Sequence, residues 1–344
     1  MTAVTARKPV AGVAASLTLL AALLSGCAAA APSAPATSAS SGAKTTIRIA
    51  SLKGPTTMGL VKLMSDADAG KTTQDYRTTM YGTPDEVVPL ITKGTVDVAV
   101  LPSNLASVLY NKTKTADGPQ IQVAAINTLG MLELVESGNT IKSVADLKGK
   151  TIYSTGKGAS PEYDLDYLLE SNGLDPATDV TVEFKSEPTE LAAILATKPG
   201  AIGVLPQPFV TVLKSKNPAV RTALSFTKEW AKVAPNSELV TGVVVVRKDF
   251  ADKHRAAFNT FLTDYKASAA FTNAKPALAA PLIVKAGIVP TAAIAQAAIP
   301  ACNITYIEGA KLKTLMSGYL KVLFKADAAS VGGSLPGNDF YYRR

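Results

Sequence analysis

Residues 96–102 read Val-Asp-Val-Ala-Val-Leu-Pro, and this short run decides how the fold is interpreted. Only Asp97 interrupts its hydrophobic side chains, so the run predicts a continuous apolar strand. Pro102 ends the strand and opens a predicted helix that continues through Tyr110. A strand that leads directly into a helix is typical of α/β proteins with parallel sheets.

Strands and helices alternate on both sides of this run. Strands are expected at 46–52, 74–80, 96–101, 151–154, 180–184 and 201–205, and helices at 55–67, 84–92, 102–110, 161–172 and 188–197. The apolar positions within each range follow the period of its element.

The second group of strands and helices repeats the first. The two stretches superpose at a fixed offset of 104 residues without a gap, so that Pro84 falls on Pro188 and Pro102 on Pro206. The geometry shared by βαβ units explains such matches as well as a duplication does, and both origins stay open. Either origin predicts two similar α/β lobes.

The remaining segments complete a two-lobe plan. Extended runs at 121–136, broken near Gly130, and at 239–247 are expected to pass between the lobes as a hinge. Helices are expected at 250–272, 276–286, 291–299 and 307–324, packed on the first lobe, and the tail from Val331 is expected to be a loop or a loosely docked end. The predicted domains are lobe 1 at 45–128 plus 242–344 and lobe 2 at 129–241.

The first 26 residues predict a signal peptide. Arg7 and Lys8 precede an apolar run at 10–24, which is too short to span a membrane. The run ends in Leu-Ser-Gly-Cys27, which resembles the lipobox of bacterial lipoproteins, whose cysteine thiol receives diacylglycerol. The alternative is an ordinary cleavage site followed by an incidental cysteine. Residues 27–44, rich in Ala, Pro, Ser and Thr, are expected to form a flexible tether.

Composition excludes several functional classes. The 344 residues are 47% hydrophobic, which is ample for two buried cores, and two cysteines are too few for a disulfide framework. The single histidine, His254, rules out a His-rich metal site, and its charged surroundings indicate a solvated helix residue. The net charge of +8 is scattered, which argues against a nucleic-acid groove. We expect no metal, no cofactor and, if Cys27 is lipidated, a free buried Cys302.

Three local sequences resemble the solute-binding proteins of bacterial ABC importers of the nitrate/taurine/aliphatic-sulfonate type, which includes carriers of thiamine precursors. Residues 52–60, Leu-Lys-Gly-Pro-Thr-Thr-Met-Gly-Leu, resemble its first strand–helix junction. Residues 83–88 followed by 94–99 resemble its helix and K-G-x-x-D-[IV]-A unit. Residues 143–152, Ser-Val-Ala-Asp-Leu-Lys-Gly-Lys-Thr-Ile, resemble the entry to the second lobe, a string common across periplasmic-binding folds.

The resemblance implies a type II periplasmic-binding-protein fold. It also implies that a small solute is held between two lobes and presented to a membrane permease driven by an ATPase. With the lipobox, it implies a monomer held by a lipid anchor on the extracytoplasmic side of the cell membrane, with no nucleic-acid partner.

The carboxyl ends of the predicted strands carry the candidate ligand-binding residues, because ligands of open α/β sheets bind there. Small and hydroxyl-bearing residues leave the helix N–H groups accessible, which suits a polar or anionic ligand. The candidates are Gly54, Thr56, Thr57, Tyr81, Ser103, Asn104, Thr128, Ser154, Thr155, Lys157, Gly158, Ser160, Gln207 and Thr241. Residues 154–160 form the best anion cradle, although they lack P-loop spacing. The hydroxyls can equally serve as helix caps, and Trp230 is expected to pack in a core.

Two other functions stay open at this point. One is an enzyme on the same fold, since pyrimidine-precursor synthases of thiamine biosynthesis and dehydratases of menaquinone biosynthesis resemble this architecture. The synthase chemistry relies on histidine and the dehydratases are cytosolic, and the sequence offers no Cys-His or Ser-His pair for a nucleophilic mechanism. The other is a tethered sensor module that feeds no transporter, which neighbouring permease and ATPase genes would distinguish.

Overall fold

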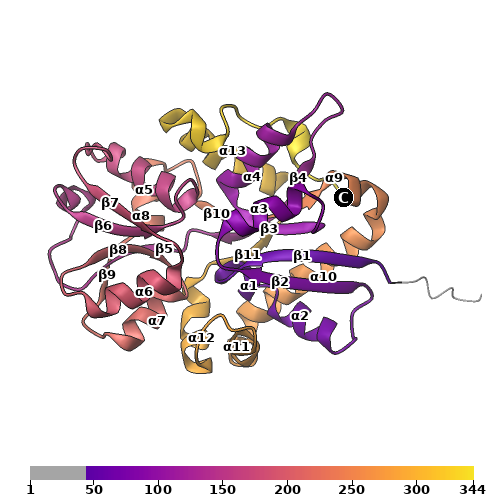
Figure 1. Ribbon diagram of the computed structural model, residues 1–344, viewed down its shortest axis with the longest axis horizontal. Helices are drawn as coiled ribbons and strands as arrows, with labels where there is room; N and C mark the ends of the chain where they lie inside the picture. Colours follow the sequence, from indigo (N-terminus) through magenta and orange to yellow (C-terminus); the bar gives the residue numbers. More distant parts are fainter. Residues whose placement is uncertain (1–43) are drawn as a thin grey trace, which may run out of the picture. The chain divides into compact units, whose positions relative to one another are not determined.

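The computed structural model describes residues 44–344, which contain two mixed β-sheets (Figure 1). The predicted signal peptide, Cys27 and the predicted tether up to residue 43 lie outside the described residues. The six-stranded sheet has the order β11-β4-β10-β3-β1-β2, and the five-stranded sheet has the order β7-β6-β8-β5-β9. We call the first sheet with its helices lobe 1 and the second lobe 2.

The strands of lobe 1 are β1 (Thr46–Leu52), β2 (Asp75–Tyr81), β3 (Val98–Pro102), β4 (Ile121–Leu129), β10 (Val240–Arg247) and β11 (Ile304–Ile307). The strands of lobe 2 are β5 (Leu132–Glu136), β6 (Thr151–Thr155), β7 (Thr181–Lys185), β8 (Ile202–Pro206) and β9 (Arg221–Ser225). In each sheet three strands are parallel, as expected, but β10 runs antiparallel to β3 and β5 runs antiparallel to β8.

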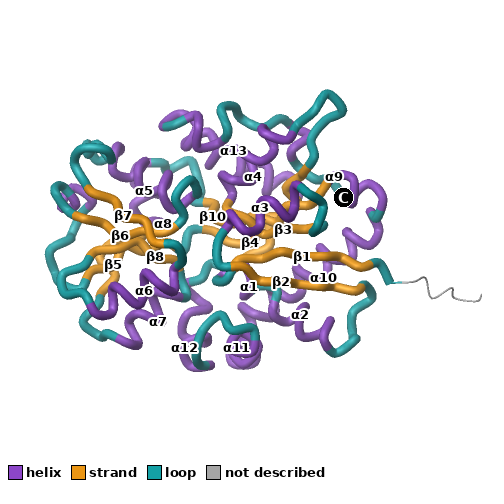
Figure 2. Tube along the Cα trace, viewed as in Figure 1, coloured by secondary structure: helices purple, strands orange, loops and turns teal. Residues whose placement is uncertain are grey.

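Helices cover both faces of each sheet (Figure 2). In lobe 1, α3 (Pro84–Thr92), α4 (Ser103–Thr113) and α13 (Gly309–Ala326) cover one face, and α2 (Val61–Asp68), α10 (Arg255–Ala274) and α11 (Pro276–Lys285) cover the other. In lobe 2, α5 (Ser160–Ser171) and α8 (Phe226–Val233) lie opposite α6 (Pro188–Thr197) and α7 (Phe209–Lys216). The short helices α1 (Pro55–Met58), α9 (Lys248–Lys253) and α12 (Ala292–Ala298) complete the main elements.

The valine run of β10 shows why its strand is wholly apolar. Val243 and Val245 are buried in the core under α4 and α13, whereas Val244 and Val246 are buried in the core under α10. Successive side chains of a strand point to opposite faces, so a sheet covered on both sides requires apolar residues at every position.

Several predicted boundaries are wrong. The helix expected at 55–67 divides into α1 and α2, and the helix expected at 250–272 divides at exposed His254 into α9 and α10. The helix expected at 307–324 begins only at Gly309, because residues 304–307 pair as β11 with β4. The elements α7, α8 and β9 were not expected from the sequence. The run 221–225, which forms β9, is short and only partly apolar.

The C-terminal tail is docked. Phe340, Tyr341 and Tyr342 are buried, and the carboxylate of Asp339 pairs with Lys114 at 3.0 Å. The aromatic residues at the end of the tail therefore anchor it to lobe 1 despite its glycines.

Strand pairing shows that the internal repeat contains a one-residue shift. Ile49 pairs with Val98 in lobe 1, and Ile152 pairs with Ile202 in lobe 2. The first strands of the two lobes are therefore offset by 103 residues, whereas the third strands are offset by 104. The gap-free superposition is thus wrong by one residue at the first strand, and both lobes share the strand order second-first-third.

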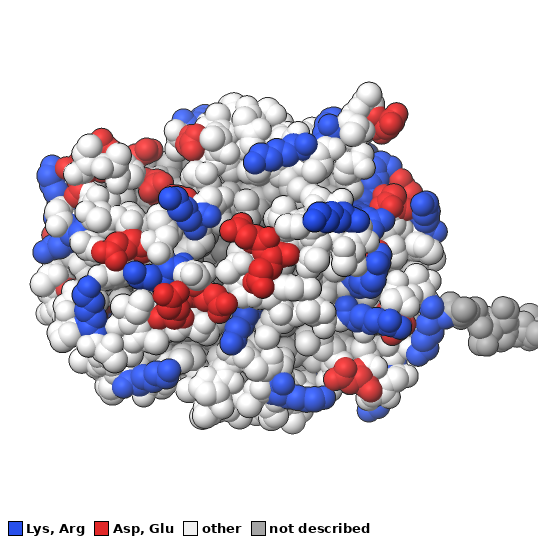
Figure 3. Space-filling view, viewed as in Figure 1, with Lys and Arg blue, Asp and Glu red and all other residues white. Residues whose placement is uncertain are grey.

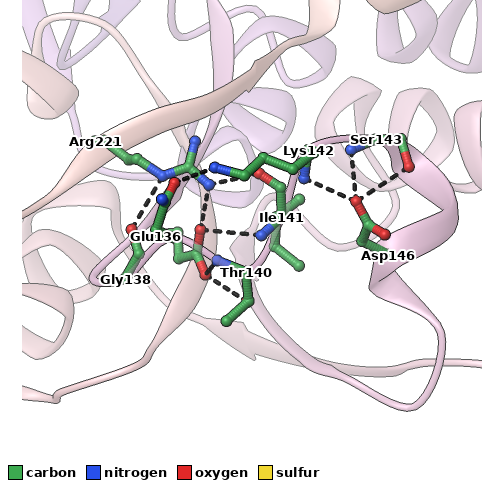
Figure 4. Close-up of polar contacts among 9 residues, drawn as sticks. Glu136, Gly138, Thr140, Ile141, Lys142, Ser143, Asp146 and Arg221 are labelled. Carbon is green, nitrogen blue, oxygen red and sulfur yellow. Dashed lines mark hydrogen bonds and ion pairs between the residues drawn. The ribbon is translucent and has the colours of Figure 1, made fainter.

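A buried ion pair fixes the segment that follows β5 (Figure 4). The carboxylate of Glu136 is 2% exposed and accepts hydrogen bonds from the backbone N–H groups of Thr140 at 2.6 Å and Ile141 at 3.2 Å. Arg221 Nη2 donates to Glu136 at 2.6 Å. Ser143 and Asp146 then form a capping box, so the segment from β5 to β6 follows a defined path.

Within residues 44–344, no helix is long and apolar enough to cross a membrane. Cys302 is free and buried, as expected.

Candidate functional site

A cavity of about 110 Å³ lies where the carboxyl ends of the parallel strands of both sheets meet. Each of the six strand-to-helix junctions contributes one proline to its wall. These prolines are Pro55, Pro84 and Pro102 from lobe 1 and Pro161, Pro188 and Pro206 from lobe 2. Four of them lie in the first turn of a helix, where proline is favoured because its fixed φ suits the helix and its missing N–H is not needed, whereas Pro102 and Pro206 are the last residues of β3 and β8.

The polar lining of the cavity consists mainly of hydroxyl groups. They belong to Thr56, Thr155, Ser160, Ser186 and Thr241. Lys53 is the one charged residue in the lining, and among residues 44–344 its side chain makes no hydrogen bond or ion pair. Apolar lining comes from Leu52, Met131, Leu132 and Ala159. The lining therefore combines an apolar wall with hydroxyl groups and one cation.

On lobe 1, the start of α1 is held by its own threonines. The hydroxyls of Thr56 and Thr57 donate to the carbonyl of Leu52 at 3.0 and 2.5 Å. Thr57 is fully buried beneath the wall, where its Oγ1 also lies 2.6 Å from Ser51 Oγ. Thr56 thus lines the cavity, whereas Thr57 is buried behind the cavity wall.

On lobe 2, residues 154–160 turn tightly into α5. Gly156 lines the cavity with φ of 74°, a conformation that glycine adopts without strain. The backbone N–H of Gly158 donates to the Glu162 carboxylate. Lys157 is exposed, with Nζ 5.9 Å from the ring of Phe184. The cation of this segment therefore lies outside the cavity, whereas Thr155 and Ser160 line it.

Ser160 also joins the two lobes. Its hydroxyl donates to Oδ1 of Asn104 on α4 at 3.1 Å, and both residues are fully buried. Asn104 Nδ2 in turn donates to the carbonyl of Ser330 at 3.0 Å. Asn104 is therefore a contact between the lobes in this arrangement.

The neighbouring strands β4 and β10 form the floor of the site where they lead to and from lobe 2. Thr241 lines the cavity and donates to the carbonyl of Leu129 at 3.0 Å. Thr128 is fully buried, and its hydroxyl lacks a partner in the described part of the chain. A Cβ added at Gly242 would lie 2.4 Å from Thr128 Oγ1 and 2.6 Å from Asn127 Oδ1. Only glycine fits at position 242, where β10 pairs with β4.

Other predicted positions make internal contacts. Ser103 donates to the carbonyl of Val240 at 2.5 Å, and Ser154 donates to that of Thr155 at 3.3 Å. Gln207 Oε1 accepts from the hydroxyl of Thr211 at 2.8 Å. Tyr81 is half-buried against the core of lobe 1.

The structure thus places four predicted residues in the cavity lining, namely Thr56, Thr155, Ser160 and Thr241. The other ten lie outside the lining: Gly54, Thr57, Tyr81, Ser103, Asn104, Thr128, Ser154, Lys157, Gly158 and Gln207. Sequence reasoning missed Ser186, although it lies 104 residues after Gly82, which also lines the cavity. It also did not predict the six prolines as part of the wall, although each stands at the junction between a strand and the helix that follows it.

Neither His254 nor Trp230 belongs to the site. His254 is exposed, and Trp230 is 1% exposed with its ring 4.9 Å from that of Tyr167 and 5.4 Å from that of Tyr319. Over residues 44–344, no group of three His, Cys, Asp or Glu side chains is arranged to hold a metal. Lysine and arginine are spread over the visible face and not gathered in one patch (Figure 3).

Comparison with known proteins gives consistent matches. The family model described as "ABC transporter, phosphonate, periplasmic substrate-binding protein" matches residues 71–292. No curated protein sequence matches.

Solved structures show the same fold. An ABC transporter protein from Parabacteroides distasonis is 22% identical with a TM-score of 0.70, over 88% of this chain and 100% of that chain. The aliphatic sulphonate binding protein SsuA from Escherichia coli is 15% identical with a TM-score of 0.65, over 83% and 94%. The nitrate-binding protein NrtA from Synechocystis PCC 6803 is 12% identical with a TM-score of 0.63, over 84% of each chain. The fold is the type II periplasmic-binding-protein fold.

Proposed function

The chain belongs to the family of phosphonate-type periplasmic substrate-binding proteins of ABC transporters, and on that basis we propose that its inter-lobe cavity captures a small polar or anionic solute. As a solute-binding component of an ABC importer it acts on the extracytoplasmic side. Its partners are a small-molecule solute and a permease with its ATPase.

The position of the cavity carries the proposal. It lies at the strand ends of both sheets, and its wall contains the first residues of helices from both lobes. The free N–H groups of a helix N-terminus and the dipole of the helix both favour negative charge. Among the lining hydroxyls, those of Thr155 and Ser186 make no hydrogen bond within residues 44–344 and can donate to a solute, and Lys53 supplies one positive charge.

Lobe motion about the crossovers is part of the proposal. We assign 45–128 with 242–344 to one rigid lobe and 129–241 to the other, with the hinge at the two crossovers near Thr128 and Thr241, which lie at the end of β4 and the start of β10. A cavity walled by both lobes opens when they rotate apart and closes over the solute when they return.

The remaining parts of the proposal concern the cell surface. The sequence around Cys27 supports a lipid anchor, and the tether would give the binding domain reach from the membrane. The protein is proposed to act as a monomer and to bind its solute without catalysis.

A thermal-shift panel on the mature chain tests the proposal. Nitrate, methanesulfonate, taurine, methylphosphonate and bicarbonate are titrated separately, and at least one is expected to raise the melting temperature, because a ligand bound only to the native state stabilises it. The same ligand should raise the melting temperature of Ser160→Ala less than that of wild type. A flat response to the whole panel would contradict an anionic solute, and an equal response of Ser160→Ala would move the site away from this cavity.

A further inference from the structure

A second place where the lobes meet is lined by carboxyl groups. Helix α5 of lobe 2 lies against α13 and the short helix 328–331 of lobe 1, and a cavity of about 290 Å³ remains between them. Four carboxylates line this cavity: Asp166, Glu170 and Asp175 from lobe 2 and Asp327 from lobe 1. Tyr163 and Tyr167 line it as well.

Asp164 is buried in the same interface. It is fully buried on α5, and its Oδ1 accepts a hydrogen bond from the hydroxyl of Tyr319 on α13 at 2.8 Å. Its Oδ2 has no partner in the described residues. The hydroxyls of Ser103 and Ser160 lie beside the Tyr319 phenol, which connects Asp164 to the wall of the solute cavity.

No cation neutralises these groups. Within residues 44–344, no lysine, arginine or histidine pairs with Asp164, Asp166 or Asp327, nor with the neighbouring carboxylates Glu162 and Glu170. The lysines nearest along α13, Lys321 and Lys325, line a separate cavity beside Glu170.

Burial raises the pKa of both aspartates, and like charge adds to the effect at Asp166. Burial, with additional repulsion from Glu162, Glu170 and Asp327, raises the pKa of Asp166 to about 7. Burial raises the pKa of Asp164 well above its ordinary value, and the hydrogen bond from Tyr319 offsets only part of this effect. An ionised carboxylate at either position would lie without a counter-ion.

We propose that closure of the lobes takes up protons at Asp164 and Asp166, so that mild acid favours the closed arrangement that holds the solute. The inference rests on the proposed function in one respect, namely that the two lobes move. When they separate, α13 and Asp327 withdraw from α5, so that water reaches the fully buried Asp164 and the half-buried Asp166 becomes fully solvated.

The sign follows from linkage. A group that binds its proton more tightly in the closed arrangement shifts the equilibrium toward closure as pH falls through its closed-state pKa. For one aspartate with a pKa of about 7 in the closed arrangement and an ordinary value of 3.8 when solvated, the closed-to-open ratio rises up to about tenfold for each pH unit below 7. Asp164 adds to the effect in the same direction.

Trp230 provides a built-in reporter for this interface. It is the only tryptophan of the chain, and its ring packs between Tyr167 of α5 and Tyr319 of α13. Opening of the interface should expose the indole and shift its emission to longer wavelength. The test therefore records Trp230 emission and the radius of gyration of the ligand-free protein from pH 5 to pH 8.5.

The variants Asp164→Asn and Asp166→Asn, singly and together, remove the titrating groups while keeping the side-chain size. Wild type is expected to open as pH rises, with red-shifted emission and a larger radius of gyration. The double variant should keep the acid-form signals at every pH. Asp117→Asn, the same change at an exposed turn, should titrate like wild type.

Two results would overturn the inference. One is a wild type whose emission and radius do not change over the pH range, and the other is a double variant that titrates like wild type. Circular dichroism checks that each variant is folded. If the double variant does not fold, the single variants replace it, and single variants that titrate like wild type at both positions overturn the inference. Solute binding in the thermal-shift panel is a separate readout, so a failure of proton coupling leaves the binding function standing.

Discussion

The hydroxyl of Ser160 on α5 donates a hydrogen bond to Oδ1 of Asn104 on α4 at 3.1 Å, across the boundary between the two lobes. Ser160 also lines the solute cavity. The same side chain is therefore placed to respond to the solute and to the position of the opposite lobe.

Ser160→Ala is expected to weaken solute binding about tenfold or more, because it removes both a cavity hydroxyl and the bond to Asn104. Calorimetry with the ligand found by the thermal-shift panel measures the change. Lys157→Ala is the matched comparison, since this cation lies outside the cavity, and its affinity should stay within about twofold of wild type. The assignment of the lobe 2 site fails if the lysine variant loses affinity and the serine variant does not.

Gly242→Ala should lower the free energy of unfolding by about 1–3 kcal/mol. The added methyl group would lie 2.4 Å from Thr128 Oγ1 and 2.6 Å from Asn127 Oδ1, in a region with no free space. Urea denaturation measures the loss. Gly318→Ala on α13 is the control, because its nearest neighbour would be 3.9 Å away, and it should stabilise the protein by about 0.5–1 kcal/mol. Equal effects of the two changes would refute the steric argument.

Glu136→Gln is expected to destabilise the protein by about 2–4 kcal/mol at neutral pH, since Arg221 loses its charged partner. Burial raises the pKa of Glu136, but hydrogen bonds from Thr140, Ile141 and Arg221 outweigh it and hold the pKa below 4.5. The stabilisation is therefore present above pH 4.5 and is lost as pH falls through the folded-state value.

Denaturation curves from pH 8 to pH 3 test the prediction for Glu136. The gap between Glu136→Gln and wild type should be constant down to about pH 5 and should narrow below pH 4.5. Glu183→Gln, at an exposed strand position, should show little difference at any pH. A gap that widens in acid would contradict the assigned direction of the pKa shift.

Lobe closure should be visible by solution scattering. Saturation with a solute that raises the melting temperature is expected to reduce the radius of gyration, because the lobes rotate about the two crossovers near Thr128 and Thr241. An unchanged profile at pH 8.5, where the ligand-free protein is expected to be open, would count against the hinge.

Cys27→Ala should release the protein into the medium or leave its leader uncleaved. The reason is that the variant has no thiol to receive the lipid, so anchoring at the lipobox-like sequence fails. Mass spectrometry of the mature wild-type N-terminus is the direct measurement. An unmodified Cys27 on the mature protein would rule out the lipid anchor.

Much of the fold was readable from the sequence because local patterns and tertiary context agree. The valines of β10 and the junctions at Pro84 and Pro188 fall where expected. Strands such as β9 and β11 were missed because four or five residues of mixed polarity acquire their structure from pairing with neighbours and not from their own pattern.

The candidate site was less readable, for a physical reason. Sequence order places Thr56 beside Thr57 and Lys157 beside Gly158, but which neighbour reaches the cavity depends on side-chain direction within one helical turn or loop. Thr57 and Lys157 point elsewhere, and no periodicity of the sequence records that.

The wall of six prolines has a consequence for altering specificity. Proline has already lost most of the backbone freedom that a loop gives up when it binds a ligand, so within each lobe the turns that line the cavity are rigid before any solute arrives. A library that varies only Thr56, Thr155, Ser160, Ser186 and Thr241 would change the side chains that face the solute while the backbone turns that carry them stay the same. The protein is for that reason a convenient starting point for biosensors that need new recognition without a new scaffold.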